Sequence, residues 1–285
     1  MKVMATLGKL AVLVVSGAAL YHYVGDLSVP TTHVAKVTPA KGVTYSNTPT
    51  LFIPGWGGNA FAYNKMIGNY QQQHYGEKVL TIKVGWSGKL NFSGDWDHRP
   101  VNPMIQVLFM HNLTLDYSQQ TEWVRHILEV LKSRYGVQTY NIVAHSWGGS
   151  AAVNALILHG DAKAQPRLNK MVLLGAPVNE ALGEKDSIVG RFLPSKRDEA
   201  YNALVAAKGS LTSNRNAQIY NFYGSINHRQ SDGQTAFSQA QSLRALVAHT
   251  GIGYHEKQIN GVSHYQLHSS PKMWALIAKT LWMSD

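Results

Sequence analysis

The sequence predicts an α/β fold in which a mostly parallel central sheet carries helices on both faces. After residue 48, apolar runs rich in β-branched residues alternate with segments of helical periodicity. The chain has 285 residues, of which 45% are hydrophobic, and this is enough for one large domain with a substantial core. We therefore expect a single α/β domain over residues 49–285.

Each expected element has a local signature. The expected strands are short, apolar runs that cover residues 50–53, 78–84, 104–109, 140–143, 170–174 and 217–223. The first expected helix carries an apolar stripe of Trp123, Ile127, Val130 and Leu131 at 3.6-residue spacing. Further helices are expected from the end of the strand at 140–143 to about His159, near 198–208 and over 272–282.

Two long inserts interrupt this alternation, at residues 85–103 and 178–215. Long inserts in α/β folds tend to lie over the carboxyl ends of the strands, where sites form. We expect residues 178–215 to form a lid-like insertion. For residues 85–103, a segment that shapes the site and a plain surface excursion both remain open.

The segment Ala144-His145-Ser146-Trp147-Gly148 lies between the strand at 140–143 and a helix rich in small residues. A strand that ends in a sharp turn with a serine at its apex is typical of the nucleophile elbow, G-x-S-x-G. Small residues are needed there because neighbouring chain passes close to the turn. An ordinary βα turn is the alternative interpretation.

A serine nucleophile needs donors for an oxyanion, and two backbone N–H groups are candidates. The Gly-rich loop after the first strand presents Trp56 between Gly55 and Gly57, and Trp147 follows the serine. A Gly-rich turn without chemistry is the alternative for this loop. A phosphate-binding loop is excluded, because the chain has neither G-x-G-x-x-G nor G-K-[ST].

The acid and the base are expected in the chain order serine, acid, histidine. Asp232 is the only acidic residue between Glu199 and Glu256, although Asp-Gly also forms turns. His264 is the expected base and His268 the second candidate. The spacing of these histidines also suits a metal on a helix. We expect no metal, because no acidic or cysteine ligand is close in sequence. We expect no cofactor, because a serine nucleophile with an acid and a base needs none.

Charge and composition limit the classes of binding partner and of site that the protein can have. Lys and Arg number 26 against 16 acidic residues, for a net charge of +10, and the basic residues are scattered. This favours attraction to an anionic membrane or cell wall over a nucleic-acid partner. No cysteine is present, so disulfides, thiolate sites and lipoprotein attachment through cysteine are excluded.

The first 25 residues combine lysines with an apolar run, Leu10 to Leu20, which is typical of a signal peptide or an N-terminal membrane anchor. Residues 26–48 are rich in Thr, Ser, Pro and Lys and form an expected linker. The protein is therefore expected outside the cytoplasm, either secreted or membrane-anchored.

Over about residues 45–285 the chain resembles the α/β-hydrolases of the DUF915 type, lipase-like proteins of Firmicutes. The resemblance is carried by FIPGWGG (52–58), NPMIQV (102–107), NIVAHSWGG (141–149), LGAPVN (174–179), SDG (231–233) and HYQLH (264–268). It implies the α/β-hydrolase fold, a Ser146–His264–Asp232 triad, and oxyanion donors at Trp56 and Trp147. The chain departs from the family pattern at Pro54, usually His, at Ala144, usually Gly, and at Ser225, often Asp.

The expected function is that of a serine hydrolase, carboxylesterase-like or lipase-like, which cleaves small-molecule or lipid esters through an acyl-enzyme intermediate. Two alternatives remain open: a non-catalytic envelope-binding protein on a hydrolase fold, and an acyltransferase or peptidase with the same triad. Trp56, Trp86, Trp96 and Trp147 are candidates for an apolar acyl pocket, with core packing as the alternative.

Overall fold

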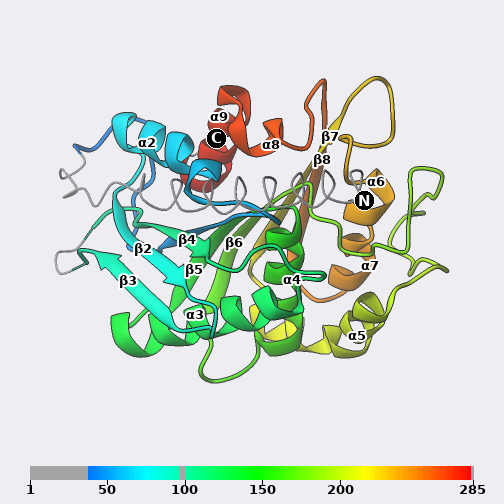
Figure 1. Cartoon of the computed structure of the whole chain (residues 1–285), viewed down its shortest axis with the longest axis horizontal. Helices are drawn as coiled ribbons and strands as arrows, with labels where there is room; N and C mark the ends of the chain where they lie inside the picture. Colours follow the sequence, from blue (N-terminus) through cyan, green and yellow to red (C-terminus); the bar gives the residue numbers. More distant parts are fainter. Residues whose placement is uncertain (1–37, 97–99, 284–285) are drawn as a thin grey trace, which may run out of the picture.

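A computed structural model describes residues 38–96 and 100–283. Its centre is an eight-stranded sheet with the order β3-β2-β4-β1-β5-β6-β7-β8 (Figure 1). The strands are β1 (Thr50–Ile53), β2 (Lys78–Val84), β3 (Leu90–Gly94), β4 (Met104–Phe109), β5 (Thr139–His145), β6 (Arg167–Leu174), β7 (Gln218–Ser225) and β8 (Gly253–Asn260). Only the edge pair of β2 and β3 is antiparallel.

Helices cover both faces of this sheet. The α-helices are α2 (Asn64–Gln72), α3 (Ser118–Tyr135), α4 (Trp147–His159), α5 (Glu199–Ala207), α6 (Phe237–Gln241), α7 (Leu243–Val247), α8 (Gln266–Ser269) and α9 (Pro271–Trp282). The 3-10 segments are η1 (Ala60–Ala62) and η2 (Lys208–Asn214). Helices α3, α4 and α5 lie on one side of the sheet, and α2, α8 and α9 lie on the other (Figure 1).

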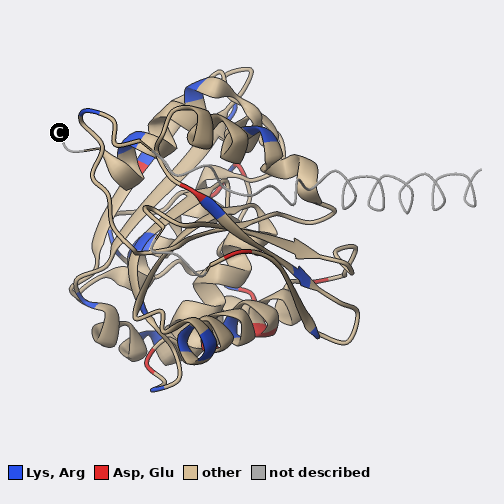
Figure 2. Cartoon of the chain, turned by 90° about the vertical axis from the view of Figure 1, so that its left-hand side faces the viewer, with Lys and Arg blue, Asp and Glu red and all other residues tan. Residues whose placement is uncertain are grey.

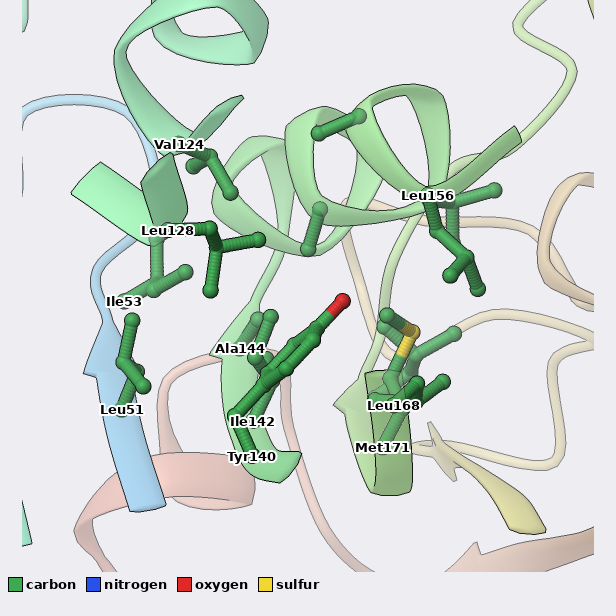
Figure 3. Close-up of a cluster of buried hydrophobic side chains, with 14 of the residues drawn as sticks. Leu51, Ile53, Val124, Leu128, Tyr140, Ile142, Ala144, Leu156, Leu168 and Met171 are labelled. Atoms are coloured by element: carbon green, nitrogen blue, oxygen red, sulfur yellow. The ribbon is translucent and has the colours of Figure 1, made fainter. Parts of the chain in front are cut away.

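Alternate residues of the central strands pack into two separate hydrophobic cores, one on each face of the sheet. Leu51 and Ile53 of β1 belong to the larger cluster, beneath α3 and α4, whereas Phe52 belongs to the cluster beneath α2 and α9. In β5, Ile142 belongs to the larger cluster (Figure 3). The next residue, Val143, belongs to the smaller cluster. The continuous apolar runs of the sequence therefore follow from a sheet that is buried on both faces.

The α/β architecture expected from the sequence, a mostly parallel sheet with helices on both faces, is confirmed, and all six expected strands lie in one sheet. Two further strands were not expected. Residues 90–94 of the first insert form the antiparallel edge strand β3, and β8 forms the opposite edge. In α3 the buried stripe includes Val124 and Leu128, while Val130 is only half-buried.

The second insert, residues 178–215, contains α5 near the place where a helical segment was expected. The expected signal peptide or anchor at residues 1–25, and the first part of the expected linker, lie outside the described residues. Within residues 38–96 and 100–283, no helix is long and apolar enough to cross a membrane. In the view of Figure 2, Lys and Arg are scattered over helices, strands and loops.

Candidate active site

The tight turn between β5 and α4 places Ser146 at its apex. Ser146 has φ 52° and ψ −132°, a conformation that a residue with a Cβ adopts only where the surrounding structure enforces it. Its N–H donates to the carbonyl of Leu174 over 3.0 Å. A Cβ at Gly148 would lie 2.2 Å from the carbonyl oxygen of Pro54. Neighbouring chain therefore passes close to the turn, and this is why small residues are needed beside the serine.

A buried carboxylate–imidazole pair lies at the same edge of the sheet. Asp232 is 1% exposed and His264 is 5% exposed. Nδ1 of His264 donates to Oδ2 of Asp232 over 2.8 Å. The other carboxylate oxygen accepts the backbone N–H groups of Gln234 and Thr235, over 3.0 and 2.8 Å. Because Nδ1 carries the shared proton, Nε2 of the imidazole is left to accept another.

Contacts between the loops after β6, β7 and β8 hold this pair in place. The backbone N–H of His264 donates to the carbonyl of Asp232 over 2.9 Å, which fixes the β8 loop on the β7 loop. Gly175, at the end of β6 with φ 61°, lies beneath the pair, and its carbonyl accepts the hydroxyl of Thr235 over 3.0 Å. The carboxyl ends of neighbouring parallel strands thus meet around one site, as expected for an open α/β sheet.

Ser146 lies between two cavities. The first, of about 240 Å³, is lined by Ser146, His264, the Gly-rich loop after β1, Phe61 and Tyr265. The second, of about 350 Å³, shares Trp56, Ser146 and Gln234 with the first and reaches Trp147 and Glu180. The Ser146 hydroxyl and the His264 imidazole share the first cavity but form no direct hydrogen bond. Such bonds are commonly long before substrate binds and shorten in the complex.

Two further histidines surround His264. The ring of His145 lies 4.4 Å from the ring of His264 and 4.5 Å from that of His268. Nε2 of His145 donates to the His264 carbonyl over 3.0 Å, and Nδ1 of His268 donates to the carbonyl of Ala62 over 3.0 Å. Burial lowers the pKa of His145 well below its usual range and that of His268 to about 4. Both rings are therefore neutral at pH 7.

The structure also locates the two candidate oxyanion donors. Within the described residues, no hydrogen bond takes up the backbone N–H of Trp56 or of Trp147. The loop that carries Trp56 is held by Asn112, whose Nδ2 donates to the carbonyls of Gly55 and Gly58 over 2.7 and 3.0 Å. Both tryptophans line the second cavity together with Ser146. Their N–H groups remain available for a developing negative charge.

The expectation that Trp86 and Trp96 line an acyl pocket needs correction. Trp86 and Trp96 were candidates for an acyl pocket, but neither lines a cavity that contains Ser146. Trp86 stacks on His111 and Trp96 stacks on Tyr135, because the first insert pairs along the sheet edge instead of folding over the site. Among the described residues, no group of three or more His, Asp or Glu side chains is placed to hold a metal ion.

His268, the second candidate for the base, does not contact Asp232. Its Nδ1 is bonded to a backbone carbonyl, whereas Nδ1 of His264 is bonded to the carboxylate.

Sequence reasoning did not find Glu180, Gln234, Asn112 or His145 as residues of the site. Glu180 lies in the second insert, and its Oε1 accepts the indole N–H of Trp147 over 2.7 Å. Partial burial raises the pKa of the Glu180 carboxyl, and the Trp147 hydrogen bond opposes that rise. For Asn112 and Gln234, no pattern in the sequence pointed to these contacts. For His145, its place beside Ser146 in the elbow was the one available signal.

The family comparison decides the superfamily. Residues 37–284 match the family model described as alpha/beta hydrolase of unknown function (DUF915). The chain belongs to this family. The resemblance drawn from the sequence motifs is thereby confirmed, and the protein is a member of the α/β-hydrolase superfamily.

Solved structures give the same fold at low sequence identity. A structure from Listeria innocua, the lin2722 product, has a TM-score of 0.75 and 23% identity, covering 83% of this chain and 94% of that one. A presumed cell surface hydrolase from Lactobacillus plantarum WCFS1 has a TM-score of 0.64 and 15% identity, covering 82% of this chain and 89% of that one. No curated protein sequence matches the chain. At these identities the likeness establishes the fold alone.

Proposed function

We propose that the protein is a serine hydrolase that cleaves carboxylic esters, with Ser146 as nucleophile, His264 as base and Asp232 as the residue that orients the base. The observation that carries the proposal is the buried pair of His264 and Asp232, joined over 2.8 Å, beside a serine held in a strained elbow. This is the arrangement that serine acyl transfer requires.

The chemistry follows from the placement of these groups. The Ser146 oxygen attacks the ester carbonyl carbon, and its proton passes to Nε2 of His264. The negative charge on the former carbonyl oxygen is held by the N–H groups of Trp56 and Trp147, each worth about 3 to 4 kcal/mol of barrier. His264 then gives its proton to the departing alcohol, which leaves an acyl-Ser146 ester.

Water completes the reaction through the same groups. His264 takes a proton from the water as the water attacks the acyl carbon, and then returns a proton to Ser146 as the acid departs. Asp232 stabilises the imidazolium that forms in each half. A lipid or small-molecule ester is the substrate class that fits cavities of about 240 and 350 Å³ beside the serine.

The test is covalent labelling of the pure protein with a fluorophosphonate probe, together with turnover of p-nitrophenyl acetate. We expect an adduct on Ser146, located by peptide mass spectrometry, and a loss of turnover by several orders of magnitude in Ser146→Ala. The matched control is Ser87→Ala, at an exposed serine in the turn between β2 and β3, which should leave both readouts unchanged.

The same experiment separates the alternatives. A folded wild-type protein that takes up no probe and cleaves no ester would support a non-catalytic envelope-binding protein. Transfer of the acyl group to an added alcohol, in preference to water, would indicate an acyltransferase. Cleavage of peptides but not of esters would indicate a peptidase.

We also propose that the protein acts outside the cytoplasm, at an anionic membrane or cell wall. The lysines and apolar run of residues 1–25 and the net charge of +10 support this location. The presumed cell surface hydrolase among the structural neighbours agrees with it. Cell fractionation and protease treatment of intact cells would test the location, and recovery in the cytosolic fraction alone would contradict it.

A further inference from the structure

The two cavities beside Ser146 differ in chemical character. The first is lined by glycines, aromatic rings, three imidazoles and the carboxamides of Asn59 and Gln234. The second shares Trp56, Ser146 and Gln234 with the first, but its lining includes a carboxylate, that of Glu180. Its other polar residues are Gln239 and Thr235. Among the described residues, no lysine or arginine lines either cavity, although the whole chain has 26 such residues against 16 acidic ones.

Glu180 is the only charged side chain among the described residues that line the second cavity. Its Oε1 is fixed by the indole N–H of Trp147, the residue that directly follows the nucleophile. Its Oε2 has no hydrogen bond and no ion pair with any described residue. A carboxylate oxygen is therefore held next to the nucleophile with capacity to accept a further donor.

The negative character continues beyond Glu180. A further cavity of about 420 Å³ is also lined by Glu180, together with Asp116, Asp198 and Glu199, and no basic residue of the described part of the chain lines it. Asp116 and Asp198 have local structural roles, because each accepts a backbone N–H at the start of a helix. Glu180 has no such role, and no described lysine or arginine pairs with it. By contrast, Glu184 in the same insert pairs with Arg229.

The aromatic walls complement this carboxylate. Trp56 and Trp147 both line the second cavity, and tryptophan faces attract cations through their ring electrons. A carboxylate and indole rings together form a good environment for an ammonium group and an unfavourable one for an anion.

We propose that the substrate is an ester that carries a positive charge, as a protonated amine or a quaternary ammonium group, and that this group lies in the Glu180 cavity. The proposal rests on the proposed serine hydrolase and names its substrate class. The cation contacts Glu180 and the side chains of Trp56 and Trp147 while the ester carbonyl lies at Ser146. Binding energy from a group remote from the reacting carbon is thereby used to position that carbon.

The test compares esters that differ only in charge. One pair places the cation on the alcohol: acetylcholine and 3,3-dimethylbutyl acetate, in which carbon replaces nitrogen. The other places it on the acyl group: p-nitrophenyl 4-(trimethylammonio)butanoate and p-nitrophenyl 5,5-dimethylhexanoate. For at least one pair we expect kcat/KM to be about tenfold higher for the cationic ester. The pair that shows the preference identifies which side of the ester occupies the cavity.

Variants locate the source of that preference. Glu180→Gln keeps the size of the side chain and should bring the ratio of the two kcat/KM values close to one. The control Glu184→Gln removes a carboxylate from the same insert, outside the cavities that contain Ser146, and should keep the wild-type ratio.

The outcomes separate the two proposals. If the neutral p-nitrophenyl acetate is hydrolysed but neither pair shows a cationic preference, the substrate class proposed here is wrong and the hydrolase function stands. The same holds if the preference survives in Glu180→Gln. Absence of turnover for every ester, together with no probe adduct, would overturn both.

Discussion

At the scale of single residues, Gly175 controls the geometry of the carboxylate–imidazole pair. Its φ of 61° is unfavourable for any residue with a Cβ. A Cβ there would lie 2.7 Å from Oδ2 of Asp232 and 3.1 Å from Nδ1 of His264, the two atoms that share a proton. The pair can adopt its 2.8 Å hydrogen bond only because position 175 has no side chain.

Gly175→Ala should therefore impair catalysis as well as folding. We expect kcat/KM for p-nitrophenyl acetate to fall at least about tenfold, because the methyl group displaces the His264 imidazole from the Asp232 carboxylate. Stability should fall by about 2 kcal/mol, from backbone strain plus steric overlap. Urea unfolding followed by circular dichroism gives the stability.

The matched control for that prediction is Gly136→Ala. Gly136 has φ 68°, nearly the same strain, but a Cβ at this position would meet no atom within 4 Å, and the residue follows α3 and lines neither cavity that contains Ser146. The variant should lose about 1 kcal/mol of stability and keep its kcat/KM. Equal loss of activity in the two variants would show that strain, not displacement of the pair, limits catalysis.

The chain order and the residue types were enough to point to Ser146, Asp232 and His264. The elbow has a steric signature, and Asp232 has no competitor between Glu199 and Glu256. The contact of Glu180 with Trp147 was not predictable, because it joins positions 33 residues apart through an insert with no regular pattern. A local sequence pattern predicts the local backbone conformation, but it does not predict which side chains from distant parts of the chain will contact that segment.

At the scale of elements, strand β8 was not predicted because it lies at the edge of the sheet, where a strand needs few apolar residues. As an edge strand, it has polar side chains at most positions, and only Ile259 is buried. The central strand β1 is buried at all four positions and was readily recognised. Recognition therefore followed burial on both faces, which edge strands lack.

The start of β2 contains a buried lysine, Lys78, whose Nζ donates to Oε1 of Gln106 in the neighbouring strand β4 over 2.7 Å. Burial lowers the pKa of Lys78 from 10.5 to about 8. Between these two values the unfolded chain binds the proton that the folded chain has lost. Unfolding free energy should therefore rise with pH from about 8 to about 10.5, by on the order of 3 kcal/mol in total.

Lys78→Met should abolish this rise. The measurement is urea unfolding at pH 7.5 and pH 9.5. The readout is the difference between the unfolding free energies at the two pH values, because Oε1 of Gln106, left without its donor, lowers stability at both. Lys89→Met removes an exposed lysine from the turn between β2 and β3 and should keep the wild-type difference. A rise with pH that persists in Lys78→Met would assign it to other groups.

At the scale of the whole molecule, the two ends of the described chain hold each other. Val43 pairs with Met283 in an isolated antiparallel bridge, and the N–H of Thr44 donates to the Trp282 carbonyl over 2.6 Å. The Trp282 ring meets the Tyr70 ring of α2 edge-on, at 5.1 Å between centroids. This contact between α2 and α9 was not predictable, because a terminal helix pattern does not specify its partner.

Trp282→Ala should test whether this contact stabilises the fold without shaping the site. Trp282 is 3% exposed and lines neither cavity that contains Ser146. Loss of so large a buried ring should cost about 3 to 5 kcal/mol, a large share of the 5 to 15 kcal/mol typical of a domain. At 15 °C, where the folded form persists, kcat/KM per folded molecule should stay close to the wild-type value.

The control is Lys272→Ala, at an exposed position of the same helix, which should change neither the unfolding free energy nor kcat/KM. A fall in kcat/KM with an unchanged urea midpoint would instead show that α9 acts on the site through α8 and the loop that carries His264.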